Sequence, residues 1–233
     1  ELDQKSLSDL ATQLATNLIS KTSKTTHLAS SNQSLRYFVD GLKAAYRDNW
    51  WLAISNFRKS LHIEKTERGS FSLGQYHLGS AFIFQGWLQA GIDHLREAQK
   101  NSPAIPELHY MLALGLFYQY SIKQMPENLR VEMIRSCEVA LTLRSRFPEA
   151  LYLLGSIYYH IGREAERDLS DLITFGQEVG SSGEHSEVSL KVRRKALLSD
   201  RRRYFQSSLN YFKLAQREFT SIFSEHQLRR DKL

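Results

Sequence analysis

Glycine recurs through this chain at a nearly constant spacing. Gaps of 38, 36 and 40 residues separate Gly41, Gly79, Gly115 and Gly155. Around these glycines, apolar and small residues follow one another at helical spacing, interrupted by short breaks. Such a period, with two helices in every unit, is typical of an α-solenoid, in which successive helix pairs stack on their neighbours. The repeat therefore predicts an all-α fold.

The composition agrees with a helical, globular chain. The 233 residues include only four prolines and twelve glycines, which leaves few of the turn-forming residues that an all-β protein of this size needs. With 42% hydrophobic residues, the chain can bury a sizeable core. The single cysteine, Cys137, excludes an intrachain disulfide and a zinc site built on cysteines. We therefore expect a cytoplasmic protein in which Cys137 is a small buried residue.

The best-preserved unit, residues 76–103, overlaps an uncharged segment. From Gly69 to Ile92, 24 consecutive residues include no Asp, Glu, Lys or Arg, and a segment of this length can cross a bilayer. However, the helical pattern is interrupted at Gln85–Trp87, and the segment contains five glycines and three glutamines. Each half is too short to span a bilayer. We therefore interpret the segment as a helical hairpin buried in a solenoid.

Small and large residues alternate through this unit in a specific order. The order runs through Leu78, Gly79, Phe82, Gly86, Gly91, Leu95, Ala98 and Pro103. It resembles the tetratricopeptide repeat (TPR) family, in which a Leu-Gly pair and an aromatic residue mark the first helix, and a small, a large and an alanine residue mark the second. The repeat around Gly41 is less regular, with Asp40 where leucine is usual. The resemblance covers roughly residues 34–160 and 204–219 and implies a TPR-like α-solenoid of about four helix pairs.

The recurring glycines have a physical explanation. Two helices of a pair approach closely only where one presents a small residue to a bulky side chain of the other. Glycine lowers helix stability by about 1 kcal/mol relative to alanine, so its recurrence indicates that close packing outweighs helix propensity. We therefore predict that Gly79 is a packing glycine.

The second helices of the last two repeats come later than the pattern requires. In the third repeat, about six residues late, the matching residues are Met133, Cys137 and Ala140. In the fourth, about forty residues late, they are Ser208, Phe212 and Ala215. Both insertions fall at turns between helices, where a solenoid tolerates them.

The longer insertion carries its own helical pattern. The apolar residues of the preceding helix continue to about Phe175, and a breaker-rich stretch follows at residues 176–187. From Val188 the helical pattern returns and lasts some forty residues. This predicts a long helical hairpin extension near the C-terminus, with a second helix about 60 Å long.

The N-terminal segment differs from the repeats. Spacings of three and four residues separate Leu7, Leu10, Leu14 and Leu18, which predicts an amphipathic helix, and a polar linker follows it. We therefore divide the chain into this helix and linker (1–33), the TPR-like repeats (34–162), and a hairpin arm with the long helix that completes the last repeat (163–233). Over some twenty residues, the N-terminal segment also resembles the junction before the TPR array of bacterial signalling proteins such as some nucleotide cyclases. This second resemblance implies a regulatory segment of a larger signalling enzyme.

In TPR arrays, the first helices line a concave groove that binds peptides or partner helices. Carried onto this sequence, the groove residues are Phe38, Leu42, Tyr46, Tyr76, Ser80, Ile83, Phe84, Leu112, Leu116, Gln119, Tyr120, Tyr152 and Tyr159. TPR proteins that hold the acidic tail of heat-shock chaperones use Lys, Arg and Asn on this face, so a carboxylate clamp is not expected. The expected partner is an apolar or aromatic helix or peptide of another protein. The alternative is self-association, in which the N-terminal helix of the same chain or a second copy fills the groove.

Positive charge is concentrated on the predicted arm. Residues 191–203 carry seven Lys or Arg and one Asp, which accounts for the whole net charge of +6. The basic residues are Lys191, Arg193, Arg194, Lys195, Arg201, Arg202 and Arg203. Clustered arginine binds the phosphates of nucleic acid and of anionic lipid. The alternative is that these residues pair with Glu164, Glu166, Asp168 and Asp171 on the preceding helix and otherwise face water.

The sequence carries no recognisable catalytic motif. It has no glycine-rich phosphate loop, no GxSxG elbow and no HExxH zinc helix, and its eight histidines are scattered without metal-ligand spacing. We therefore expect no enzyme activity, no cofactor and no metal. The sequence predicts a non-catalytic scaffold for protein–protein interaction. The alternatives are a regulatory segment of a larger signalling enzyme and a polyanion binder that uses the basic arm.

Overall fold

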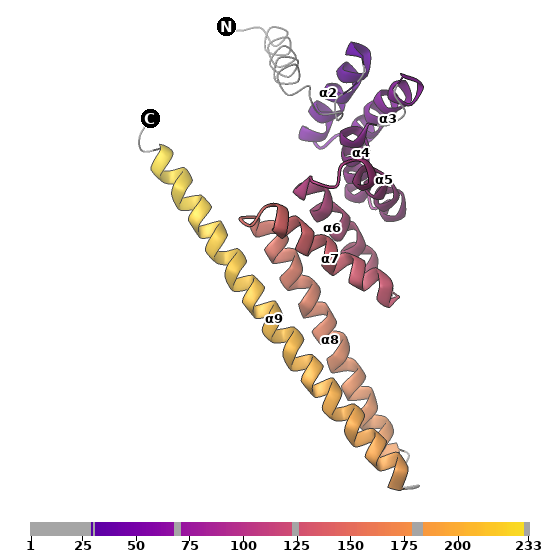
Figure 1. Cartoon of the computed structure of the whole chain (residues 1–233), viewed down its shortest axis with the longest axis vertical. Coiled ribbons are helices and arrows are strands. Elements are labelled where there is room, and N and C mark those ends of the chain that lie inside the picture. The colour runs from indigo at the N-terminus through magenta and orange to yellow at the C-terminus, as the bar shows by residue number, and fades with distance from the viewer. Residues whose placement is uncertain (1–28, 30, 68–70, 123–125, 179–183, 231–233) are drawn as a thin grey trace. The chain divides into compact units, whose positions relative to one another are not determined.

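The computed structural model describes residues 29, 31–67, 71–122, 126–178 and 184–230, and every regular element within them is an α-helix (Figure 1). The fold is therefore all-α, as the repeat predicted. The predicted N-terminal helix lies outside the described residues. The chain divides into two compact units, Glu1–Met133 and Ile134–Leu233, and the boundary falls inside one helix.

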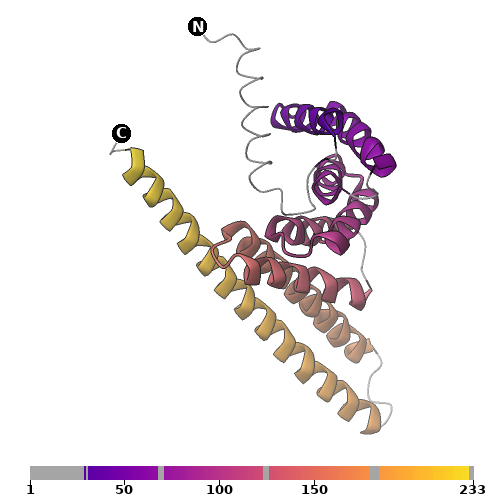
Figure 2. The same cartoon turned by 45° about the horizontal axis from the view of Figure 1, so that its top comes forward.

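Helix pairs make up the first unit. The first pair is α2 (Asn32–Tyr46) and α3 (Trp50–Glu67), and the second is α4 (Ser72–Phe84) and α5 (Leu88–Asn101). Helix α6 (Pro106–Ile122) follows, and α7 (Glu127–Leu143) begins in this unit. From α2 to α6, each helix packs against the next one in the chain (Figure 2). This order of contacts is that of a solenoid, because each helix pair is covered by its neighbours in sequence.

The turns inside the first two pairs share one backbone conformation. Asp48 and Gly86 each stand two residues after a first helix, and their φ angles are 56° and 78°. Glycine adopts this left-handed conformation without strain, and aspartate is among the residues that tolerate it best. The turn at Gly86 confirms the break that the sequence predicted at Gln85–Trp87.

The recurring glycines of these pairs lie where two helices come closest. A methyl group on Gly41 would lie 2.5 Å from the ring of Phe57. A methyl group on Gly79 would lie 2.8 Å from Leu95 and 2.9 Å from the carbonyl oxygen of Gly91. These distances are far below van der Waals contact, so Gly79 is confirmed as a packing glycine.

Aromatic rings form the centre of the core that joins α2, α3 and α4. Phe38, Phe57, Phe71 and Phe82 are almost fully buried. The ring centroid of Phe38 lies 5.8 Å from that of Phe57 and 5.2 Å from that of Phe71. These tilted and edge-to-face arrangements are favourable for aromatic pairs, so the rings hold successive helices together.

The described part of the uncharged run forms α4, the turn after it and the start of α5. These helices have 13 and 14 residues, about half of what a membrane-spanning helix needs. Across the described ranges, none of the helices combines the length and the apolar character required to cross a bilayer.

A long hairpin dominates the second unit. Helices α8 (Pro148–Glu178) and α9 (Glu184–Arg230) run side by side in both views (Figures 1 and 2). Helix α8 continues past Phe175, and α9 has 47 residues, which corresponds to about 70 Å. The predicted hairpin extension is therefore confirmed, while the division of the chain at residues 33/34 and 162/163 stays a prediction.

A seven-residue register holds the two helices of the hairpin together. A methyl group on Gly155 would lie 2.8 Å from the ring of Phe212, and one on Gly162 would lie 3.1 Å from the ring of Phe205. Seven residues forward on α8 thus correspond to seven residues back on α9, as in an antiparallel coiled coil. The buried residues of α9 beside these contacts are Ser208 and Ala215. The residues that the sequence assigned to the second helix of the last repeat are therefore the ones that pack on α8.

Candidate partner-binding surfaces

Six predicted groove residues lie in the core instead. The structure buries Phe38, Ser80, Ile83, Leu112, Leu116 and Tyr120. Ile83 shows the reason, because its side chain lies 2.7 Å and 2.6 Å from where methyl groups on Gly91 and Gly115 would be, on α5 and α6. A first helix in a solenoid packs against its own partner and against the next repeat. These six residues are therefore corrected to core residues that present no surface to a partner.

Five predicted groove residues of the first unit keep an exposed surface. They are Leu42, Tyr46, Tyr76, Phe84 and Gln119. Gln119 turns toward α5, where its side-chain amide donates to the Gln89 carbonyl oxygen at 3.0 Å. Tyr76 lies edge-on to the His77 ring, with 4.7 Å between centroids. What remains for a partner is thus an uncharged but much smaller surface than the sequence predicted.

Exposure at one position of the repeat falls steeply from the first repeat to the third. Tyr46, Phe84 and Tyr120 follow one another at the spacing of the recurring glycines, yet their exposed fractions are 92%, 51% and 6%. Equivalent residues thus change from surface to core between the first and third repeats. The aromatic surface of the first unit is therefore concentrated in its first two repeats.

All three tryptophans of the chain gather at the turns of these two repeats. The ring centroid of Trp50 lies 4.8 Å from that of Phe84, and Trp51 meets Trp87 edge-on at 5.1 Å. Trp51, Phe84 and Trp87 are exposed, while Trp50 is half-buried. We call these four residues the aromatic edge. The sequence analysis missed the tryptophans as a surface, although their confinement to two equivalent turns was a usable signal.

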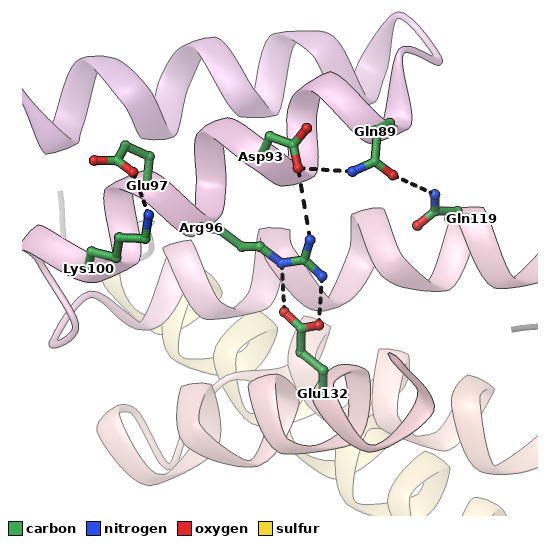
Figure 3. A network of polar contacts seen from close by, with 7 residues as sticks. All are labelled: Gln89, Asp93, Arg96, Glu97, Lys100, Gln119 and Glu132. Carbon is green, nitrogen blue, oxygen red and sulfur yellow. Dashed lines mark hydrogen bonds and ion pairs between the residues drawn. The ribbon is translucent and has the colours of Figure 1, made fainter. Parts of the chain in front are cut away.

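A polar network joins α5, α6 and α7 within the first unit (Figure 3). The guanidinium of Arg96 donates two hydrogen bonds to the carboxylate of Glu132, from Nε at 2.9 Å and from Nη2 at 2.7 Å. Asp93 lies 3.9 Å from the same guanidinium and accepts from Gln89 at 2.9 Å, and Gln89 contacts Gln119. The hydrogen bond to Glu132 raises the pKa of Arg96. Arg96 is thus held by carboxylates of its own helix and of α7, so the network is a structural clamp between helices.

One histidine belongs to the aromatic core. The ring of His77 lies 5.3 Å from Phe38 and 5.7 Å from Phe57, and Tyr76 lies beside it. Burial lowers the pKa of His77 to about 4. His77 is therefore neutral at physiological pH and packs as an aromatic ring.

A second histidine forms hydrogen bonds to the segment that connects the second and third repeats. His109 is buried, and its Nε2–H donates to the carbonyl oxygen of Pro103 at 2.6 Å. Its Nδ1 accepts from the side-chain amide of Gln99 at 3.2 Å. Both ring nitrogens are thus committed to structural hydrogen bonds. Within the described part of the chain, no group of three or more His, Cys, Asp or Glu residues is placed to hold a metal ion.

The basic arm lies on the first half of α9. Its exposed residues are Lys191, Arg193, Arg194, Lys195, Arg202 and Arg203. Arg201 is half-buried, and its Nε lies 3.8 Å from the carboxylate of Glu166 on α8. Arg203 pairs with Asp200 at 3.0 Å. The predicted pairing across the hairpin is thus seen for Arg201, and most of the positive charge remains on the surface.

Two predicted groove residues, Tyr152 and Tyr159, lie exposed on α8 in the second unit. They are seven residues apart and therefore share one helix face. Ring centroids join Tyr152 to Phe212 at 5.2 Å and Tyr159 to Phe205 at 5.8 Å. Their exposed rings thus continue the apolar surface of α9 onto α8.

Two tyrosines and the cysteine of the second unit are titratable groups that take part in helix packing. Tyr158 stacks on Tyr211 with 5.6 Å between ring centroids and an interplanar angle of 4°. Burial is the main cause that raises the pKa of both phenols. Burial also raises the pKa of the Cys137 thiol, which suppresses thiolate chemistry. Cys137 is therefore the small buried residue that the sequence predicted.

Comparisons with known proteins find solved structures of similar fold, but no matching family model and no matching curated protein. A MamA protein of known structure shares 17% identity with a TM-score of 0.47, over 80% of this chain and 91% of that chain. A thermophilic TPR protein of Thermus thermophilus shares 13% identity with a TM-score of 0.48, over 82% and 99%. A TPR repeats protein of Bacteroides fragilis shares 14% identity with a TM-score of 0.27, over 82% and 100%.

The fold assignment rests on the chain's own helices, because these identities and TM-scores are low. Successive helix pairs recur with glycine at their closest approach, the first two pairs turn at equivalent residues, and each helix from α2 to α6 packs on the next. A hairpin built on the same glycine contacts follows them. The chain therefore has a tetratricopeptide-like α-solenoid fold with a long helical hairpin extension.

Proposed function

We propose that this chain is a non-catalytic interaction scaffold that binds an apolar or aromatic helix or peptide of another protein through its first two repeats. The aromatic edge is the observation that carries this proposal. Trp51, Phe84 and Trp87 stay exposed, whereas the core rings beside them, Phe57 and Phe82, are buried. Large aromatic side chains of this kind are the usual anchors of protein interfaces, because they bury much area for few rotatable bonds.

The surroundings of the edge favour an apolar partner over an acidic one. The half-exposed and exposed groove residues of these repeats, Leu42, Tyr46 and Tyr76, are uncharged. No lysine or arginine therefore stands among them to clamp a carboxylate. Burying apolar surface contributes about 25 cal/mol for each Å², and uncharged side chains lose little on desolvation. A helix that presents Leu, Ile or aromatic residues along one face is the partner that gains most.

The other functional hypotheses stay predictions. The N-terminal helix, which would fill the groove or join a signalling domain, lies outside the described residues. The cytoplasmic location rests on the single cysteine alone. A polyanion-binding role has the exposed charges of the basic arm in its favour, but it does not explain the exposed aromatic rings.

The test uses an array of synthetic helical peptides with graded apolar faces, incubated with the labelled full chain. We expect binding to rise with the aromatic and aliphatic content of the peptide face. The double variant Trp51→Ser/Phe84→Ser should weaken binding about tenfold or more, while circular dichroism stays helical. The matched control is Tyr118→Ser, because Tyr118 is an exposed aromatic residue on α6 in the same unit. Equal binding by the double variant and the control would contradict the proposal.

A further inference from the structure

Helix α9 carries two heptad seams, and the outer one is only partly covered by α8. The inner seam packs on α8 through residues such as Ser208 and Ala215. The outer seam alternates steps of four and three residues between 198 and 223, which is the spacing of a coiled-coil core. Six of its eight positions are apolar: Leu198, Phe205, Leu209, Phe212, Phe219 and Phe223. The other two positions are Arg202 and Gln216.

Four apolar positions of the outer seam lie open to solvent, while Phe205 and Phe212 are half-buried against α8. Leu198, Leu209 and Phe219 are exposed, and Phe223 is 65% exposed. The seam is continued sideways by Tyr152 and the neighbouring Tyr159 of α8, whose rings lie against Phe212 and Phe205. The result is an apolar strip two helices wide. Soluble proteins seldom leave a contiguous strip of this kind uncovered, because its hydration is unfavourable.

The shape and length of the strip fit a third helix. A shallow hollow of about 960 Å³ lies along the first half of the seam, with Leu198, Phe205 and Leu209 among its lining residues. The seam repeats every seven residues, so apolar side chains of a docked helix can enter it as knobs into holes. A helix of about four heptads would cover it and complete a three-helix coiled coil.

Charge specifies the chemistry of that helix. Arg202 stands in the seam and lines the hollow together with Arg201 and Arg203. Arg201 and Arg203 already have carboxylate neighbours, Glu166 and Asp200. Arg202 is exposed within an apolar row, where a docked helix would take it out of water and would need a carboxylate opposite it. We propose that the outer seam docks an amphipathic helix of another protein that has an apolar heptad seam and acidic flanks.

A second copy of the chain fits the seam less well. In a parallel pairing of two α9 helices, the basic ends would face each other. In an antiparallel pairing, each basic end would meet the region of Glu218 and Glu225 on the other copy. Both carboxylates are already held by Arg146, at 3.0 Å and 2.9 Å. Charge complementarity therefore favours an acidic helix of a different protein.

Binding of a polyanion would account for only part of this surface. Nucleic acid would contact the arginines but leave Leu209, Phe219 and Phe223 in water. An anionic membrane would take the apolar side chains, but the exposed Asp168 and Asp171 of α8 would be repelled by its headgroups. The site uses none of the residues of the aromatic edge, so either proposal can fail without affecting the other.

The test measures binding of designed peptides to the full chain by fluorescence anisotropy. The probe is a labelled peptide of about four heptads with Leu and Ile in its core and Glu on both flanks, which repels itself and stays monomeric. Two matched peptides carry Lys on the flanks or Ser in the core. We expect the acidic peptide to bind about tenfold or more tightly than either. Equal binding of the acidic and the basic peptide would overturn the charge assignment.

Variants of the chain complete the test. Leu209→Ser/Phe223→Ser and, separately, Arg202→Glu should each weaken binding of the acidic peptide about tenfold, and Arg202→Glu should favour the basic one. Leu214→Ser is the matched control, because Leu214 is exposed on α9 outside the seam. If the unmodified chain forms a dimer that Leu209→Ser/Phe223→Ser dissolves, the occupant is a second copy. If RNA or anionic vesicles bind and only Arg202→Glu weakens them, the seam is not a helix-docking site.

Discussion

Helix α4 of the first unit and helix α9 of the second show opposite relations between sequence and burial. Helix α4 has 13 residues and packs against α3, α5 and α6, and its apolar residues Leu78, Phe82 and Ile83 are buried. Helix α9 has 47 residues and packs along α8, and it leaves Leu209 and Phe223 exposed. Both helices use glycine contacts to approach a neighbour. The number of neighbouring helices, rather than the local pattern, thus decides how much apolar surface is covered.

The largest expected difference between the two regions is in how much the truncation of one leucine lowers the free energy of unfolding. Leu112 is fully buried in the first unit, and Leu209 is 47% exposed on the hairpin. We expect Leu112→Ala to lower the free energy of unfolding by about 2–5 kcal/mol, because it leaves a cavity. We expect Leu209→Ala to change it by less than about 0.5 kcal/mol. Urea unfolding followed by tryptophan fluorescence reports the first unit, which holds all three tryptophans, and circular dichroism reports both units. A stable Leu112→Ala variant would restore Leu112 as a groove residue.

Acid should destabilise the first unit and spare the hairpin. The pKa of His77 is about 4 in the folded chain and about 6.5 in an unfolded one. Between these pH values the unfolded chain binds a proton that the folded chain does not, so the free energy of unfolding falls as the pH drops from about 6.5 to about 4. The loss is on the order of 3 kcal/mol. The half-buried tyrosines of the hairpin, Tyr158 and Tyr211, have raised pKa values and stay protonated throughout.

Denaturation curves at several pH values, read by tryptophan fluorescence, measure this loss. His77→Phe should flatten the pH dependence between about 6.5 and about 4, because phenylalanine does not titrate. His62→Gln is the control, since His62 is exposed on α3, and it should keep the dependence. An unchanged slope in His77→Phe would mean that another group carries the acid sensitivity.

Replacing glycine by alanine should affect stability differently at Gly79 in the first unit and at Gly162 in the hairpin. A methyl group on Gly79 would meet the Gly91 carbonyl oxygen at 2.9 Å, whereas one on Gly162 would meet only the movable ring of Phe205, at 3.1 Å. Overpacking against backbone destabilises by about 1–3 kcal/mol, and replacing glycine by alanine in a helix gains up to about 1 kcal/mol. We therefore expect Gly79→Ala to be destabilised by about 1 kcal/mol in thermal unfolding. Gly162→Ala should be neutral or slightly stabilised, and the reverse order would contradict the close contact at Gly79.

The smallest expected difference concerns ion pairs. Glu132 holds Arg96 by two hydrogen bonds between helices of the first unit, whereas Glu166 pairs with Arg163 one turn away on the same exposed helix, at 2.7 Å. We expect Glu132→Gln to lower the free energy of unfolding by about 1 kcal/mol and Glu166→Gln by less than about 0.5 kcal/mol. Raising the salt concentration in the same denaturation assay should reduce both effects. Similar losses in the two variants would show that the network in Figure 3 adds nothing beyond a surface pair.

Helix positions were predictable from the sequence because their signals are local. The break at Gly86 and the long helices on either side of residues 179–183 follow from glycine placement and from apolar spacing. The predicted groove is wrong at Ile83, because the burial of this side chain depends on α5 and α6, which come later in the chain. The tryptophans of the aromatic edge were not predicted either, since Trp51 and Trp87 meet only when two turns stack.

By itself, the sequence determined that the chain is all-α, that it repeats in helix pairs, and that a long hairpin follows. These properties depend on the period of apolar residues and on glycine, which act within a few turns of helix. Only the tertiary structure decided which apolar residues remain for a partner. An apolar side chain is covered or exposed according to the number of helices around it. Tyr46 is therefore exposed and Tyr120 buried, although both occupy the same position of the repeat.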